Sequence, residues 1–184
     1  MYSLKNNVAL LFVFLMTLCA VAQPSVNTDS IARINQEKIA KAFHEKLNAF
    51  RKQQLCKPLE WNDTLALAGH NHNKWMTEND LLSHTENPKK NINFTGKTPS
   101  ERADYVGKRK NGWNCGENCL YFTAFVPEGK EISDLQAQSL AEQALQQWKD
   151  SREHKANMLY NYKKHGTAFF IFGPQVWATD VFSD

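Results

Sequence analysis

The chain has 184 residues, of which 42% are hydrophobic and 11% aromatic, and its formal net charge is +3. These values are typical of one packed globular domain and exclude a disordered chain, which contains few aromatic residues. A charge this close to neutral does not favour nucleic acid as a partner. The short basic run Lys108-Arg109-Lys110 precedes Asn111-Gly112 and indicates a solvated turn.

The N-terminus has the pattern of an export signal. Lys5 precedes an apolar run over residues 8–18, and Ala20-Val21-Ala22 places small residues where signal peptidase reads them. The run is shorter than the roughly 20 residues that a membrane helix needs. Cys19 suggests a lipoprotein signal as the alternative, but a leucine precedes it where that signal has a small residue. We predict that residues 1–22 are a signal peptide and that the product is secreted, extracellular or, in a Gram-negative bacterium, periplasmic.

Three cysteines follow the predicted signal peptide, namely Cys56, Cys115 and Cys119. Outside the cytoplasm, one disulfide and one free thiol are the simplest expectation. If the segment from Cys115 to Cys119 is extended, its ends lie roughly 13 Å apart and beyond disulfide reach, whereas a curled segment lets them pair. Because the sequence has no CxxC motif and no second cysteine pair, it does not indicate a structural zinc site.

Hydrophobic spacing predicts two helices in the first half of the chain. Apolar residues recur at helical intervals from Ile31 to Phe50, and Pro58 prevents this helix from continuing. Asn62-Asp63 can cap a second helix, whose inner stripe includes His72. His70 lies on the same helix, but side chains two residues apart point in different directions, so the two histidines do not form a metal-binding pair.

A polar loop from Asn79 to Lys97 follows, and long ordered loops of this kind are often functional. Thr98 and Pro99 suit the cap and first turn of a third helix, which Gly107 ends. The segment from Glu117 to Val126 is apolar and aromatic on both faces, which predicts a buried strand.

The last part of the chain predicts one more helix and a hairpin. Ser133 opens the helix, and Trp148 falls on its buried stripe. Strand-like runs from His165 to Phe172 and from Trp177 to Phe182 are joined by Gly173-Pro174. Because helices precede and flank these late strands, the expected class is α+β, with a small, mainly antiparallel sheet between helices.

Several short motifs occur in a fixed order along residues 41 to 181. They are Leu47-Asn48-Ala49-Phe50-Arg51, Pro58-Leu59-Glu60-Trp61-Asn62, Leu82-Ser83-His84-Thr85, Thr98-Pro99-Ser100-Glu101-Arg102-Ala103, Gly116-Glu117-Asn118, then Trp148, Ser151, His154 and Asn157-Met158-Leu159, and finally His165-Gly166-Thr167-Ala168 and Trp177-Ala178-Thr179. Each motif is weak alone, but the ordered set resembles the bacterial branch of the CAP superfamily, which includes cysteine-rich secretory proteins, antigen 5 and plant pathogenesis-related 1 proteins. We therefore expect the CAP domain over residues 41–184, preceded by residues 23–40 as a lead-in and the start of the first helix.

The resemblance implies an α-β-α sandwich with a cleft lined by two histidines and one or two glutamates. Carried over by position, the histidines are His84 and His154 and the first glutamate is Glu117. These are ligands that Zn²⁺ or another divalent cation accepts, with a remaining position open to water. A carboxylate close to two imidazoles is also expected to raise the pKa of at least one histidine.

This sequence departs from the full set of cleft residues at Ser151. Animal and plant members of the family have the second glutamate at that position, so a four-residue metal site is incomplete here unless Glu142, Asp150 or Glu153 approaches instead. We expect Ser151 and Asn118 to line the cleft without taking part in chemistry.

Two classes of function follow from these expectations. The first is a binding module, since the resemblance links the domain to sterol or fatty-acid binding and cell-surface roles; its cleft or flanking grooves would hold a lipid, a peptide or a surface partner. The second is a metal-dependent hydrolase that activates water in the same cleft. The missing second glutamate weakens the best acid/base set, so we favour the binding module over an enzyme and assign no catalytic residue.

We do not assign a catalytic or metal-binding role to the remaining serine and histidine candidates. Ser83 stands beside His84, but sequence neighbours rarely form a nucleophile–base pair and the chain has no nucleophile elbow. We interpret His44 as a residue on a helix surface and His165 as the first residue of a strand.

Overall fold

The computed structural model describes residues 28–89 and 93–184, so the predicted signal peptide lies outside the described residues. None of the helices in these two ranges is long and apolar enough to cross a membrane. The elements in chain order are α1 (Thr28–Gln53), β1 (Glu60–Trp61), α2 (Asp63–Glu78), α3 (Pro99–Gly107), β2 (Cys115–Thr123), α4 (Asp134–Asp150), α5 (Arg152–Leu159), β3 (Lys164–Phe172) and β4 (Gln175–Ser183).

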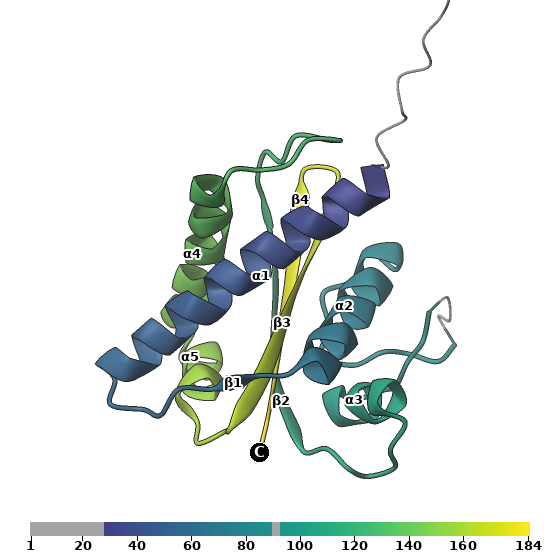
Figure 1. The fold of residues 1–184 in the computed structure, drawn as a ribbon. Coiled ribbons are helices and arrows are strands. Elements are labelled where there is room, and N and C mark those ends of the chain that lie inside the picture. Colours follow the sequence, from purple (N-terminus) through teal and green to yellow (C-terminus); the bar gives the residue numbers. More distant parts are fainter. Residues whose placement is uncertain (1–27, 90–92) are drawn as a thin grey trace, which may run out of the picture.

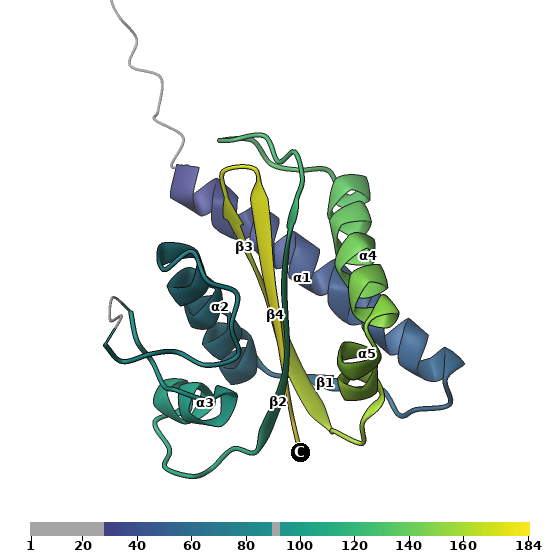
Figure 2. The same ribbon diagram turned by 180° about the vertical axis from the view of Figure 1, so that it is seen from behind.

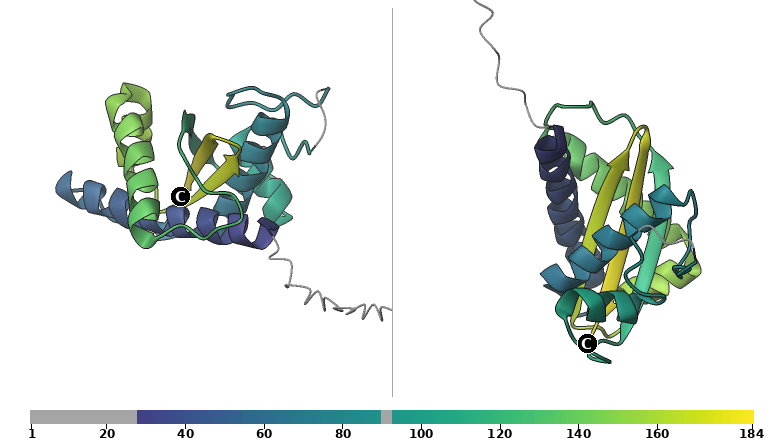
Figure 3. Two further views of the ribbon diagram at one scale, coloured as in Figure 1. Left: turned by 90° about the horizontal axis from the view of Figure 1, so that it is seen from above. Right: turned by 90° about the vertical axis from the view of Figure 1, so that its right-hand side faces the viewer.

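A four-stranded sheet with the order β1-β3-β4-β2 forms the middle layer. The central strand β4 pairs antiparallel with both β2 and β3, and only the short β1 runs parallel to its neighbour β3. Helices α4 and α5 lie on one side of the sheet and α2 and α3 on the other, while α1 crosses near β3 and packs against α4 (Figures 1 and 2). Seen from above, the sheet stands between the two helical layers (Figure 3). This is the expected α+β sandwich.

Side-chain caps determine where four of the helices begin. The sequence predicted the first three caps, at Asn62, Thr98 and Ser133, and each side-chain oxygen accepts a hydrogen bond from a backbone N–H of the first turn. The fourth cap, Ser151, separates α4 from α5 because its backbone is extended, with φ −93° and ψ 125°. The short elements α5 and β1 were not predicted, because neither is long enough to show a hydrophobic period.

The late strands follow the prediction closely. The turn at Gly173-Pro174 joins β3 and β4, and Gly173 has a φ of +55°, which glycine adopts without strain. Strand β2 begins at Cys115, two residues before the predicted start, and ends at Thr123. The difference at its start matters because Glu117 then lies inside a paired strand, opposite Val181 of β4.

The expectation of one disulfide is wrong for the described residues. Cys56, Cys115 and Cys119 are all free thiols. The alternative in which the segment from Cys115 to Cys119 is extended is the one observed, since both residues lie within β2. Their side chains therefore lie on the same face of the strand but too far apart along it to pair.

Candidate functional site

His84, Glu117 and His154 come together from three separate segments. His84 lies on the loop between α2 and α3, Glu117 on β2 and His154 on α5. The Nδ1 atom of His84 is 3.1 Å from Oε1 of Glu117, and the ring centroids of His84 and His154 are 6.4 Å apart. The His84 side chain is 55% exposed, whereas that of Glu117 is 2% exposed. The structure thus brings the expected cleft residues together, and their role stays a prediction.

Glu117 is ionised and its charge is already balanced. Burial raises the pKa of this carboxyl group, but Arg102, the hydrogen bond from His84 and the nearby His72 outweigh burial and lower the pKa to about 2. Arg102 contributes most to this lowering, because its Nη2 donates to Oε2 of Glu117 at 2.5 Å. The carboxylate therefore has a cation on one oxygen and an imidazole on the other.

Two asparagines hold α5 against β2. The Asn118 amide donates to the backbone oxygen of His154 at 3.0 Å, and the Asn157 amide donates to the backbone oxygen of Glu117 at 3.1 Å. Burial and the charge of His84 lower the pKa of His154. His154 is therefore not a histidine whose pKa the nearby carboxylate raises, and the expectation that at least one histidine pKa is raised stays a prediction.

Ser151 has a structural role as the N-cap of α5. Its hydroxyl caps α5 by accepting a hydrogen bond from the backbone N–H of His154 at 3.4 Å. Glu142 forms an ion pair with a lysine of α1 at 2.8 Å, and Asp150 accepts a hydrogen bond from a glutamine of α4 at 2.7 Å. These two carboxylates are therefore engaged elsewhere, whereas the charge of Glu153 acts on His154 and raises its pKa against the larger lowering by burial and His84.

The sequence interpretation missed His72 and Glu86. His72 is fully buried, with Nδ1 3.0 Å from Oε1 of Glu86 and Nε2 3.8 Å from Oε1 of Glu117. Its position on the inner stripe of α2 was the available signal, since a buried imidazole requires polar partners. Nothing in the local sequence identifies Glu86 as that partner.

A second group of potential metal ligands is buried and includes Glu117. One ligand atom each from His72, Glu117 and Cys119 falls within 4.8 Å of the others. Burial raises the pKa of the Cys119 thiol well above its usual value, which keeps the sulfur protonated. A ligating cysteine must lose its proton, so metal binding at this group would have to overcome the burial that keeps the thiol protonated.

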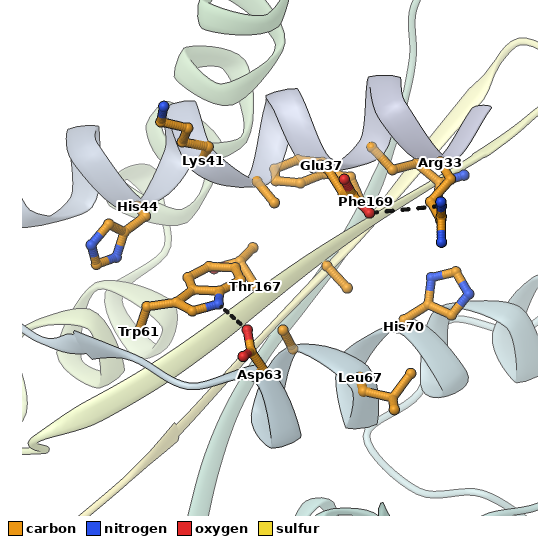
Figure 4. A pocket seen from close by; sticks show the side chains of 14 residues that line it. Arg33, Glu37, Lys41, His44, Trp61, Asp63, Leu67, His70, Thr167 and Phe169 are labelled. Carbon is orange, nitrogen blue, oxygen red and sulfur yellow. Dashed lines mark hydrogen bonds and ion pairs between the residues drawn. The ribbon is translucent and has the colours of Figure 1, made fainter. Parts of the chain in front are cut away.

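An apolar groove lies between α1 and α2, with β3 as its floor (Figure 4). Its volume is about 580 Å³. His44 and His70 stand toward opposite ends of the groove, and Trp61 lies beside His44 (Figure 4). Burial is the main cause that lowers the pKa of both histidines. The lining residues are Arg33, Gln36, Glu37, Ala40, Lys41, His44, Trp61, Asp63, Ala66, Leu67, His70, Thr167, Ala168 and Phe169.

His44 and His165 are linked, which the sequence interpretation did not anticipate. His44 is half-buried, and its Nδ1 is 2.7 Å from Nε2 of His165. His165 is fully buried, and its Nδ1 is 2.9 Å from Oδ1 of Asp180 on β4. Thr167 donates to the same carboxylate oxygen at 2.8 Å. These contacts tie the end of the groove to the centre of the sheet.

Comparisons with known proteins agree with this architecture. Residues 44–170 match CAP, the cysteine-rich secretory protein family. The fold is similar to that of an outer surface protein from Borrelia burgdorferi, with a TM-score of 0.58, 17% identity, and coverage of 80% of this chain and 93% of that protein. The fold is also similar to that of an extracellular protein containing a SCP domain from Bacillus anthracis, with a TM-score of 0.56 and 22% identity. The match covers 85% of this chain and 42% of that protein. The chain thus spans less than half of the Bacillus protein. No curated protein matches the chain.

Proposed function

Because the chain belongs to the CAP (cysteine-rich secretory protein) family, we propose that it is an exported, non-catalytic binding module that holds a lipid in the groove between α1 and α2. The groove is the observation that carries this proposal. Its volume of about 580 Å³ falls in the range of roughly 300–1,000 Å³ that small-molecule sites occupy. Export rests on the predicted signal peptide and would be tested by the intact mass of the secreted protein. A product that retains residues 1–22 would contradict it.

The chemistry of the groove favours an apolar ligand. Ala168 and Phe169 of β3 and Leu67 of α2 line it, so hydrocarbon contacts dominate its surface. The charged lining residues are two cations, Arg33 and Lys41, and two anions, Glu37 and Asp63, so their formal charges cancel. The lowered pKa values of the two histidines keep them neutral at pH 7, so the groove offers little net charge to a polar ligand.

Filling the groove should weaken lipid binding. The wild-type protein should bind a fatty acid that carries an environment-sensitive fluorophore, and Leu67→Trp should weaken this binding by at least about tenfold because Leu67 lines the groove. Leu135→Trp is the matched control, since Leu135 is an exposed leucine on α4 away from the groove. Absence of binding by the wild type, or an equal loss in both variants, would contradict the proposal.

The proximity of His84, Glu117 and His154 supports a separate metal proposal. When neutral His84 donates its Nδ1–H to Glu117, its Nε2 keeps a free lone pair, and metal-ligating histidines are commonly oriented by a carboxylate in this way. Two Zn–N bonds of about 2.1 Å require nitrogens no more than about 4.2 Å apart. The ring centroids are 6.4 Å apart, so sharing one ion requires the two imidazoles to turn their free nitrogens toward each other and to move closer together. We therefore propose His84 and His154 as ligands of Zn²⁺, with Glu117 as the residue that orients His84.

A zinc titration tests this assignment. The double variant His84→Ala, His154→Ala should lose zinc binding, whereas His70→Ala should keep it because His70 lies in the groove. Binding should also weaken as the pH falls toward about 6.5, since an imidazole must be unprotonated to ligate. Equal zinc affinity of the wild type and the double variant would refute the metal site and leave the groove proposal untouched.

The hydrolase alternative has less support from the geometry. A general base works best when its pKa lies near the operating pH, and the pKa of Glu117 is about 2. Both of its oxygens are also engaged, one by Arg102 and one by His84. Glu117 is therefore suited to holding His84 in position and poorly suited to accepting a proton from water.

A further inference from the structure

Four buried ionisable side chains form a closed ring beside His84, here called the charge ring. Its members are Glu86, His72, Glu117 and Arg102, and each side chain is at most 2% exposed. The successive distances are 3.0 Å from His72 to Glu86, 3.8 Å from His72 to Glu117, 2.5 Å from Arg102 to Glu117 and 3.8 Å from Arg102 to Glu86. Each carboxylate faces both the His72 imidazole and the Arg102 guanidinium, so these contacts offset part of the cost of burying the two carboxylates.

The charge ring also holds the loop that carries His84. Oε2 of Glu86 accepts a hydrogen bond from the backbone N–H of Thr95 at 2.9 Å, and the backbone N–H of Glu86 donates to the backbone oxygen of Lys97 at 3.1 Å. Glu86 therefore binds the returning half of the loop through its side chain and its backbone. This pairing closes the loop on itself beside the cleft.

Two other ring members bind the backbone on either side of the His84 side chain. Nε2 of His72 is 2.7 Å from the backbone oxygen of Ser83, and the Arg102 guanidinium lies 3.4 Å from the backbone oxygen of His84 itself. The exposed imidazole of His84 receives little support from packing. Its position consequently depends on how firmly its backbone is held from below.

We propose that Glu86 is a positioning residue for His84: its buried carboxylate locks the loop onto α2 and α3 and thereby directs Nδ1 of His84 at Glu117. Glu86 is the ring member that belongs to the loop itself. Its carboxylate contacts His72, Arg102 and the backbone N–H of Thr95. Its loss would leave the Nδ1 atom of His72 and the N–H of Thr95 without these partners. The proposal concerns the geometry of the cleft and holds whether or not the protein binds a metal or a lipid.

The imidazole NMR spectrum of His84 tests the proposal directly at pH 8, without any added ligand. In the wild type, the hydrogen bond to Glu117 should make the Nδ1–H tautomer of His84 dominant. Glu86→Gln should shift His84 toward the tautomer mixture of a solvated imidazole, while the signals of His70 in the groove stay unchanged. Glu78→Gln is the matched control, since Glu78 is a glutamate near the surface that contacts the same loop through Asn93. An unchanged His84 tautomer in folded Glu86→Gln would overturn the proposal.

Hydrogen exchange of the wild type decides the matter if Glu86→Gln does not fold. The backbone amides of Glu86 and Thr95 should exchange about as slowly as amides inside α2, because both are bonded within the locked loop. Exchange at the rate of an unprotected loop would show that Glu86 does not hold the segment. Neither measurement uses zinc or lipid, so a negative result here is distinct from failure of the proposed function.

Discussion

The two sides of the sheet are packed in different ways. On the side of α1 and α4, one large apolar cluster joins both helices to the sheet and includes Phe43, Trp148 and Phe169. On the side of α2 and α3, the apolar residues form two smaller clusters, and the charge ring occupies the space beside them. We infer that the first side contributes most of the free energy of folding. The second side has fewer apolar contacts, and its buried polar side chains instead fix the position of the candidate site.

The largest effect is expected from a cavity on the apolar side. Trp148 is fully buried, as the sequence predicted, and its ring meets that of Phe43 edge to face with centroids 5.1 Å apart. Trp148→Ala should lower the free energy of unfolding by about 3–5 kcal/mol, measured by urea denaturation. Trp61→Ala is the control, because Trp61 is 38% exposed and should cost clearly less. A variant at Trp148 as stable as the wild type would show that the apolar side does not dominate.

Acid should act mainly on the polar side. The pKa of Glu117 is lowered to about 2, so its contribution to stability is complete above its unfolded value of 4.5 and is lost as the pH falls from 4.5 toward 2. The shift corresponds to about 3 kcal/mol, to be measured as the unfolding free energy at a series of pH values. Glu117→Gln should be less stable at pH 7 and should show a flatter profile in this window. An equally steep profile in Glu117→Gln would place the acid sensitivity elsewhere.

The smallest effect is expected at the junction between α4 and α5. Ser151 caps α5, so Ser151→Ala should cost about 1 kcal/mol, seen as a small decrease in Tm. Ser151→Asn should restore most of the loss, because asparagine caps helices as well as serine does. A loss as large as that of Trp148→Ala would mean that Ser151 does more than cap the helix.

Local chemistry explains which parts of the fold the sequence predicted. The caps at Asn62, Thr98 and Ser133 act within one helical turn, so each can be recognised from a few neighbouring residues. The turn at Gly173-Pro174 is equally local. In contrast, α5 begins only because Ser151 interrupts a helical run, and no periodic pattern marks that break.

The candidate site was only partly predictable, because it depends on contacts between residues that are far apart in the sequence. His84, Glu117 and His154 were found through the resemblance to a family, since their spacing along the chain carries no signal of a shared cleft. The pairing of His72 with Glu86 depends on how the loop folds back onto α2, which is a tertiary contact. The same holds for His44 and His165, which meet across 121 positions of sequence. Contacts of this kind follow from the fold and cannot be derived from the residue types alone.

The link between His44, His165 and Asp180 has a further consequence for where hydrogen atoms reside. The carboxylate accepts a hydrogen bond from Nδ1–H of His165, so the Nε2 atom of a neutral His165 must act as an acceptor. His44 then has to present its own Nδ1–H at the 2.7 Å contact, which leaves its Nε2 bare and facing the Asn48 amide at 3.5 Å. With His165 neutral, one carboxylate in the centre of the sheet therefore determines which ring nitrogen carries the hydrogen in His165 and in His44, so its influence extends from β4 through β3 to α1.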